Sequence, residues 1–272
     1  MQLQENTGLA SLAQGHGPIR VGLVGFGKAG QAVCMELLKA PDIDLRWVLR
    51  RQSQGADMAE AVVGDCADGT CTPLLGLDTS PLPRLLEEQP VDFLVDFSGP
   101  GSCRLYAGPA AEAGVGIISA ISNYGDEEAA LLRDLGARIP VLHSPNITVG
   151  INFVLLAAKM LQRLAPHADI EIVEEHFRAK GEISGTARRI AQELGLDEAL
   201  HLNSIRVGGI VGRHEVIFGF PYQTVRLAHD SISRHAFGQG ALFALRALRG
   251  RDPGFYTMQQ LVAEKFAEAA ED

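Results

Sequence analysis

The chain of 272 residues lacks the cysteine and histidine spacings of a zinc site or of a thiol redox motif. Its four cysteines, Cys34, Cys66, Cys71 and Cys103, include no C-x-x-C pair, and its eight histidines show no zinc-ligand spacing. We therefore expect no metal site. We also expect free, mostly buried thiols in a reducing cytoplasm.

Long hydrophobic runs and excess positive charge are also missing. The most apolar stretch, residues 151–164, is interrupted by Lys159, Gln162 and Arg163, so it predicts a core helix rather than a membrane span. Residues 1–18 are polar, are not a secretory signal, and are expected to form a flexible extension. With 24 basic and 33 acidic residues, the net charge of −9 makes nucleic acid and anionic membranes unexpected partners.

Glycine is abundant, with 30 residues, and the first half of the chain alternates short apolar strands with amphipathic helices. Such alternation is typical of an α/β protein with a parallel sheet covered on both faces. Pro109 predicts a kink or a late start in one of these helices. The predicted strands are 19–24, 45–49, 91–97, 115–121 and 140–143, and the predicted helices are 28–39, 102–113 and 126–137.

The alternation of short strands and helices ends near residues 145–150, which predicts a domain boundary there. In the run 224–229, Val225 and Leu227 share one face and Arg226 and Ala228 the other, which indicates a sheet with one covered and one open face. Such an open face is often used for self-association. The predicted elements are helices 148–164, 184–194, 236–249 and 258–267, and strands 169–177, 203–207, 214–220 and 223–229.

A glycine motif follows the first predicted strand and opens a helix. It reads Gly25-Phe26-Gly27-Lys28-Ala29-Gly30, which is G-x-G-x-x-G. The first glycine allows a tight turn, the second lets a pyrophosphate approach the backbone, and the third lets the helix pack on the strand. The motif in this context predicts a Rossmann-type dinucleotide-binding domain.

Two further segments bear on the cofactor. Arg50 and Arg51 stand where an NAD site usually has an acid, so they favour the 2′-phosphate of NADPH, although they could be solvated arginines at a strand end. Asp96-Phe97-Ser98 ends a strand on the ligand side of the sheet. These residues either touch the cofactor or provide, in Asp96, a cap for the following turn.

A second cluster of chemistry-bearing residues surrounds a predicted strand end. His176 and Lys180 are four residues apart and precede Ser184-Gly185-Thr186, which opens a helix and forms an anion site. His176 and Lys180 are therefore candidate proton donors, with a solvated charged loop as the alternative. His214 and His229 have no nearby Asp or Ser arrangement, so we expect structural roles for them.

The chain resembles the 4-hydroxy-tetrahydrodipicolinate reductase (dihydrodipicolinate reductase) family from Val21 to about Leu261. The resemblance extends over nearly the whole chain, with motifs in the same order and spacing. It rests on residues 21–30, 96–98, 144–152, 169–174, His176 with Arg178 and Lys180, and residues 184–187, 204–212 and 254–257.

The resemblance implies hydride transfer from a nicotinamide to a cyclic, unsaturated imine with two carboxylates, in lysine and diaminopimelate biosynthesis. It places His176 beside the substrate, Lys180 as proton donor, Ser184-Gly185-Thr186 on a carboxylate, and Asn146 with Thr148 at the hinge. Ala120, Ser122 and Asn146 are expected near the cofactor. It also implies a homotetramer formed through an open mixed sheet. The domains would be 19–147, completed by 237–272, for the dinucleotide, and 148–236, an α+β domain, for substrate binding and oligomerisation.

Several departures from the family pattern indicate a divergent member. Phe177 and Ala179 replace two histidines, Gly181-Glu182-Ile183 shortens a loop, and Ala120-Ile121-Ser122-Asn123 replaces Gly-Thr-Thr-Gly. Lost polar contacts can change substrate choice strongly. The alternatives are a paralogous NADP-dependent amino-acid (amine) dehydrogenase, an imine reductase with a changed substrate, and a non-catalytic NADP(H) sensor, which the retention of His176 and Lys180 disfavours. NADH is the alternative cofactor.

Overall fold

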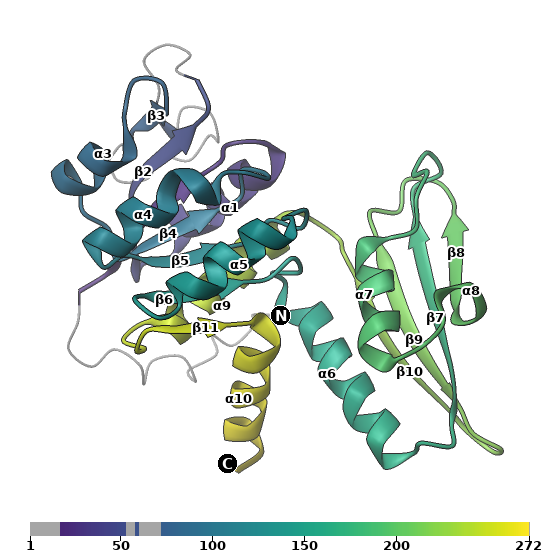
Figure 1. Ribbon diagram of the computed structural model, residues 1–272. Coiled ribbons are helices and arrows are strands. Elements are labelled where there is room, and N and C mark those ends of the chain that lie inside the picture. Colours follow the sequence, from purple (N-terminus) through teal and green to yellow (C-terminus); the bar gives the residue numbers. More distant parts are fainter. Residues whose placement is uncertain (1–16, 53–57, 60–71, 272) are drawn as a thin grey trace, which may run out of the picture.

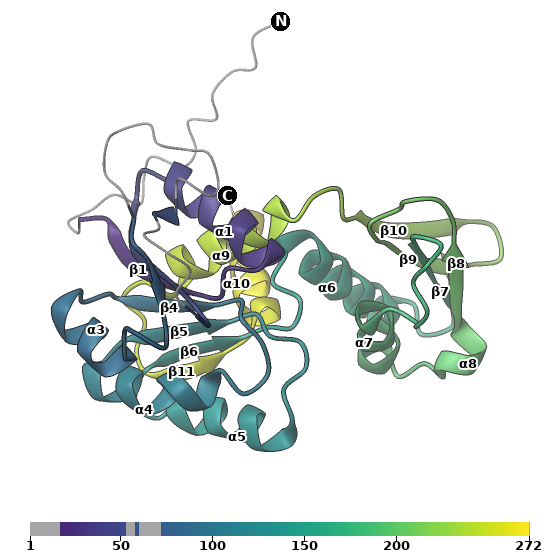
Figure 2. The same ribbon diagram turned by 90° about the horizontal axis from the view of Figure 1, so that it is seen from above.

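The computed structural model describes residues 17–52, 58–59 and 72–271. They form two lobes, which Figure 1 shows side by side and Figure 2 shows from above. The expectations for Cys66, Cys71 and residues 1–16 lie outside the described residues.

The first lobe is built on a seven-stranded sheet in which every neighbouring pair is parallel. The strand order is β11-β6-β5-β4-β1-β2-β3, so it reverses between β1 and β4. A ligand crevice is expected at the carboxyl ends of the strands at such a reversal. The strands are β1 (Ile19–Val24), β2 (Ile43–Arg50), β3 (Leu74–Gly76), β4 (Phe93–Asp96), β5 (Gly116–Ser119), β6 (Pro140–His143) and β11 (Gly254–Tyr256).

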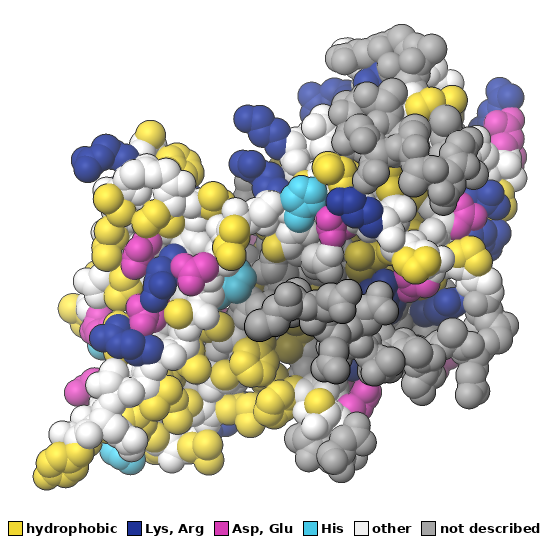
Figure 3. Space-filling view, turned by 180° about the vertical axis from the view of Figure 1, so that it is seen from behind, with side chains coloured by type: hydrophobic (Ala, Val, Ile, Leu, Met, Phe, Trp, Pro, Cys, Tyr) yellow, Lys and Arg dark blue, Asp and Glu magenta, His cyan; other side chains and the backbone are white. Residues whose placement is uncertain are grey.

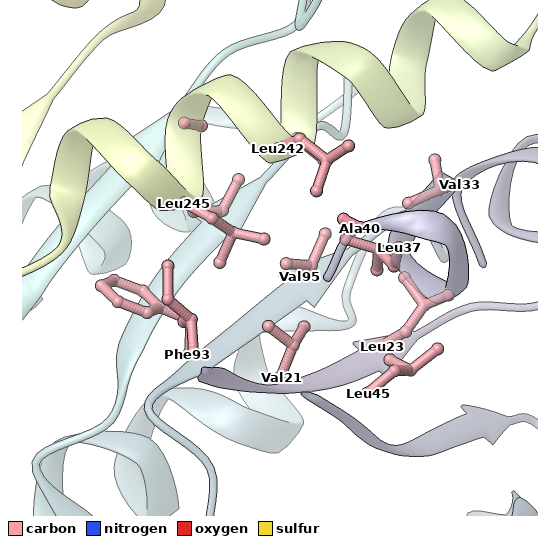
Figure 4. Close-up of a cluster of buried hydrophobic side chains, with 14 of the residues drawn as sticks. Val21, Leu23, Val33, Leu37, Ala40, Leu45, Phe93, Val95, Leu242 and Leu245 are labelled. Atoms are coloured by element: carbon pink, nitrogen blue, oxygen red, sulfur yellow. The ribbon is translucent and has the colours of Figure 1, made fainter. Parts of the chain in front are cut away.

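Helices cover both faces of this sheet. One face packs against α1 (Lys28–Lys39), α9 (His235–Leu248) and α10 (Met258–Glu271), and the other against α3 (Leu82–Glu88), α4 (Cys103–Ala113) and α5 (Asp126–Leu135). Figure 4 shows the first of these cores, where Val21 and Leu23 of β1 meet Leu37 of α1 and Leu245 of α9. The last part of the chain therefore packs beside the first helix, which fixes the outer layer of the lobe.

The second lobe holds a four-stranded mixed sheet in the order β10-β9-β7-β8, in which only β7 and β8 are parallel. Alternate residues of β7, such as Ile170 and Ile172, point toward α6 and α7, whereas Glu171 and Val173 lie on the other face. One face is thus covered and the other open. The elements are α6 (Val149–Leu164), β7 (Asp169–His176), α7 (Gly185–Leu194), α8 (Glu198–His201), β8 (Leu202–Arg206), β9 (Arg213–Gly219) and β10 (Thr224–Asp230).

The predicted fold class is confirmed, with differences in detail. β3, α3, α8 and β11 were not predicted, because three to seven residues are too few to show a period. The strands β4 and β5 are shorter than predicted, since Val91, Val115 and Ile121 are buried in the flanking turns. The late start that Pro109 predicts is wrong, because α4 begins at Cys103 and continues through Pro109 to Ala113, and the kink stays a prediction.

Candidate active site

The glycine turn between β1 and α1 has the geometry of a phosphate cradle. Gly25 has a φ of +100°, and a Cβ there would lie 2.5 Å from the Ser98 nitrogen. A Cβ on Gly30 would lie 2.0 Å from the Gly25 oxygen, whereas one on Gly27 would meet no atom within 4 Å. The outer glycines are therefore required by packing, and the middle one borders open space, as the close approach of a pyrophosphate would require.

The start of α1 suits an anion. Its first turn holds no acidic residue, and Gly27 offers no side chain to cap the helix, so the first N–H groups stay available. Lys28 and Ala29 form the first helical positions beside this turn. Phe26 is partly buried against the core of the lobe, which holds the other side of the turn in place.

The neighbouring strand ends flank this cradle. The Gly25 N–H donates to the Leu49 carbonyl at 2.8 Å, and the Phe97 N–H donates to the Val24 carbonyl at 2.8 Å. Arg50 and Arg51 at the end of β2 and Ser98 after β4 therefore lie on either side of the glycine turn, and Arg51 and Ser98 are exposed. Phe97 is partly buried against Phe237 of α9.

The carboxylate of Asp96 is buried and holds the turns that follow β4 and β5. It accepts hydrogen bonds from the Ser98 N–H at 2.9 Å, Ser102 Oγ at 2.6 Å and Tyr106 Oη at 2.9 Å. Tyr124 Oη donates to it at 3.1 Å. The geometry is that of a cap, so the structure supports the capping interpretation of Asp96.

The two tyrosines of this network were not identified from the sequence. Burial, and then the negative charge of Asp96, raise the pKa of Tyr124 and of Tyr106 well above the usual range, so both hydroxyls remain donors. Tyr124 lies just after the loop Ala120-Ile121-Ser122-Asn123, in which Ser122 and Asn123 are exposed at the carboxyl edge of the sheet. Tyr106 and Tyr124 come together only in the folded chain, so their spacing in the sequence does not indicate that both bind Asp96.

In the second lobe, Glu174 and His176 lie on the helix-covered side of β7. Glu174 is fully buried, and Nδ1 of His176 is hydrogen-bonded to its Oε2. The Arg206 guanidinium donates to both oxygens of Glu174, at 2.6 and 3.0 Å, and Ser204 Oγ donates at 2.6 Å. Burial alone would raise the pKa of Glu174, but the hydrogen bonds from Arg206, Ser204 and His176 lower it to about 2.

Arg206 also fixes the loop that carries Lys180. Its guanidinium donates to the Lys180 carbonyl at 3.0 Å and to the Glu182 carbonyl at 2.8 Å. Within the same loop, the Lys180 N–H donates to the Phe177 carbonyl at 3.0 Å. One ion pair therefore positions both of the candidate catalytic residues, His176 directly and Lys180 through its loop.

The start of α7 meets the segment between β6 and α6, which joins the two lobes. Thr186 Oγ1 donates to Asn146 Oδ1 at 2.9 Å, and the Asn146 carbonyl accepts from Ser144 and Asn152. Gly185 is exposed, and no atom lies within 4 Å of the position where its Cβ would be. The structure thus joins a residue expected at the substrate to one expected at the cofactor.

The expectation that His214 has no serine nearby is wrong. His214 Nε2 lies 2.8 Å from Ser184 Oγ, and its ring centroid is 5.3 Å from that of His176. The sequence period could have indicated this, because His214 alternates with Val216 and Phe218 on the helix-covered side of β9. His229 packs against α6, since a Cβ on Gly150 would lie 2.7 Å from its ring.

The fold and these two clusters define a class, the NAD(P)H-dependent oxidoreductases with a Rossmann-type sheet. Family models for "Dihydrodipicolinate reductase, N-terminus" and "Dihydrodipicolinate reductase, C-terminus" match residues 19–147 and 147–262. The chain belongs to the dihydrodipicolinate reductase family. The family resemblance, the oxidoreductase class and a nicotinamide dinucleotide cofactor are thereby confirmed.

Similar proteins span most of the chain. The 4-hydroxy-tetrahydrodipicolinate reductase of Caldanaerobacter subterraneus subsp. tengcongensis is 32% identical, over 67% of this chain and 80% of that protein. The reductase of the same name from Burkholderia thailandensis is 29% identical, over 87% of this chain and 94% of that protein.

Within the described residues, we find no helix with the length and apolar character to cross a membrane.

Solved structures agree on the fold. Dipicolinate-bound dihydrodipicolinate reductase from Paenisporosarcina sp. TG-14 matches with a TM-score of 0.68 and 21% identity, covering 88% of this chain and 97% of that chain. Amine dehydrogenase from Mycobacterium smegmatis matches with a TM-score of 0.58 and 13% identity, covering 90% and 96%. Both likenesses show the shared architecture of the two lobes.

Replacing Glu174 by glutamine is expected to lower the free energy of unfolding by about 2–3 kcal/mol at neutral pH, because Arg206 loses its counter-charge. Since the pKa of Glu174 is lowered to about 2 in the folded state, its contribution is complete above the unfolded-state pKa and is lost as the pH falls through the folded-state pKa. Urea unfolding should therefore show the gap between wild type and variant closing below about pH 5.

Glu88 provides the control. It lies 2.6 Å from Arg84 in an exposed ion pair on α3, away from the second lobe. Glu88→Gln should change the free energy of unfolding by less than about 0.5 kcal/mol. Equal losses in the two variants would contradict a special role for the buried carboxylate.

Proposed function

We propose that this chain reduces a cyclic, unsaturated imine that carries two carboxylates, with NADPH as the preferred hydride donor. The observation that carries the proposal is the clustering of His176, the Lys180 loop and the start of α7 around one buried ion pair. Relatives named 4-hydroxy-tetrahydrodipicolinate reductase support the same substrate class. Bound at the glycine turn, the cofactor supplies the hydride.

The residues at the start of α7 hold the substrate. The Ser184 hydroxyl and the first N–H groups of α7, including those of Gly185 and Thr186, can bind a carboxylate, because the positive end of a helix favours an anion. Thr186 is already held by Asn146, so the bound carboxylate would be fixed relative to the hinge. This anchoring places the ring of the substrate between the two lobes.

His176 and Lys180 serve the reacting atoms. Because Nδ1 of His176 is bonded to Glu174, Nε2 is the nitrogen left for the substrate, and Gly212 keeps the space beside it open. Reduction of the unsaturated imine leaves an enamine-like carbon that needs a proton. Lys180 Nζ gives that proton as an ammonium group and becomes a neutral amine.

A second candidate is an imine reductase or amine dehydrogenase of changed substrate. Phe177 is 43% exposed beside His176, and Val207, whose N–H donates to the His176 carbonyl, is also exposed. Phe177 and Ala179 stand where the family has histidines, and the loss of these polar contacts favours a less polar ring substituent. Turnover of an imine with one carboxylate in preference to one with two would favour this candidate.

Arg50 and Arg51 follow Leu49, whose carbonyl binds the glycine turn, so they are placed to reach a 2′-phosphate. Replacing both by alanine should raise the Kd for NADPH at least about tenfold and the Kd for NADH less than about twofold, by calorimetric titration. Arg46→Ala, an exposed arginine on the same strand, is the control and should change neither. Equal weakening for the two cofactors, or tighter NADH binding by the wild type, would contradict NADPH preference.

Lys180→Ala should lower kcat at least about 10²-fold on the condensation product of pyruvate and aspartate semialdehyde, with the Kd for NADPH unchanged. Lys180→Arg keeps the charge but does not release a proton at neutral pH, so its turnover should stay low. Lys265→Ala, at a partly exposed lysine on α10, is the control. Full turnover by Lys180→Ala would show that water or another group donates the proton.

We also propose a cytoplasmic location, which is supported by the buried free thiols of Cys34 and Cys103.

We further propose a homotetramer formed through the open face of the sheet of β7, β8, β9 and β10. Figure 3 shows this side of the second lobe, with acidic and basic side chains next to hydrophobic ones. Arg213 and Arg226 reach Glu215 there, so the charges are largely paired within the face.

Sedimentation velocity at micromolar concentration should show one species of four chains. Ala228→Glu should shift it toward smaller species, because Ala228 is exposed on β10 and an added carboxylate would have to be buried in the interface. A wild type that sediments only as a monomer would contradict the proposed assembly.

A further inference from the structure

His214 occupies a buried position next to the proposed carboxylate site. It lies in β9 opposite Glu174 of β7 and His229 of β10, with 4% of its surface exposed. Its Nε2 is 2.8 Å from Ser184 Oγ, while its Nδ1 is buried and has no hydrogen-bond partner among the residues that the structure describes. One ring nitrogen is therefore committed to Ser184.

The ring is neutral at physiological pH. Burial, and then the charge of His176, lower the pKa of His214 to about 4, against a smaller opposing effect of Glu174. Lys180 acts in the same direction as His176, so its charged group is within electrostatic reach of His214. A neutral imidazole carries one hydrogen, on either Nδ1 or Nε2.

The surroundings select the tautomer. A hydrogen on Nδ1 would leave a buried donor with no acceptor, which is rarer in proteins than an unsatisfied acceptor. A hydrogen on Nε2 is satisfied by Ser184 Oγ. His214 is therefore the donor of this hydrogen bond, and the Ser184 hydroxyl keeps its own hydrogen for another acceptor.

Ser184 also does not make the hydrogen bond that an N-cap serine usually makes. It occupies the N-cap position of α7 with extended backbone angles, yet its side chain makes no capping hydrogen bond. A serine at this position normally accepts from the N–H two or three residues further on. Because Ser184 Oγ is turned to His214, those N–H groups at the start of α7 remain open.

We propose that His214 is a positioning residue for Ser184, drawing its side chain out of the capping position so that Ser184 Oγ–H and the first N–H groups of α7 all face a substrate carboxylate. The inference rests on the proposed function, since it assumes a carboxylate at this site. His214 acts only through Ser184, and it touches neither the reacting carbon nor the cofactor.

The test measures the Kd of pyridine-2,6-dicarboxylate by calorimetry on protein saturated with NADPH. His214→Phe keeps a buried ring but removes the donor, and it should raise that Kd at least about tenfold with the Kd for NADPH unchanged. His214→Gln can place an amide N–H where Nε2 lies, and should stay within about threefold of wild type.

A double-mutant cycle separates positioning from a structural role. In a Ser184→Ala background, His214→Phe should change the Kd of the dicarboxylate less than about twofold, because the residue through which it acts is gone. Nitrogen NMR of labelled histidine should show hydrogen on Nε2 and none on Nδ1 of His214 in the ligand-free protein.

Three results would overturn the inference. They are an unchanged Kd in His214→Phe, equal effects of that substitution in both backgrounds, and a hydrogen on Nδ1. Failure of the wild type to bind the dicarboxylate at all would instead overturn the proposed function, and the inference with it.

Discussion

The buried carboxylate of Glu174 is the interaction on which the second lobe depends. A charge with no exposed surface is costly unless hydrogen bonds and an opposite charge compensate it. Here Arg206 and Ser204 come from β8, His176 from the same strand, and the Ser184 N–H from the start of α7 at 3.4 Å. The hydrogen bonds to this one carboxylate therefore hold β7, β8 and the start of α7 together.

The first lobe uses a second buried carboxylate in the same way. Asp96 gathers hydroxyl and N–H donors from the turns after β4 and β5, next to the glycine turn. In each lobe, one buried acidic residue thus holds the loops that carry the candidate site residues. The Thr186–Asn146 hydrogen bond then links the two sets of loops at the hinge.

Much of this could be predicted from the sequence, because the strands and helices have clear periods. The glycine turn, Arg50 with Arg51, and the segment from His176 to Thr186 all lie beside strand ends that the apolar runs already indicate. The short elements β3 and β11 have only three residues each and show no period. They form because neighbouring strands supply hydrogen bonds.

The networks behind the site were less predictable. Arg206 lies 32 residues from Glu174, and Tyr124 lies 28 residues from Asp96, so neither pairing has a local spacing. The sequence alone predicts a structural role for His214, because a sequence shows neighbours along the chain and not across a sheet. The alternation of His214 with Val216 and Phe218 indicates that its side chain lies on the covered face of the sheet. Only the register between β9 and β7 shows that it lies opposite Glu174.

In the proposed reaction, hydride passes from the nicotinamide to a ring carbon of an imine dicarboxylate. The most direct measurement is mass spectrometry of the product formed from the condensation product of pyruvate and aspartate semialdehyde with NADPH deuterated on the transferring face. The account predicts one deuterium in each molecule of reduced product. Binding of the labelled cofactor without any labelled product would contradict it.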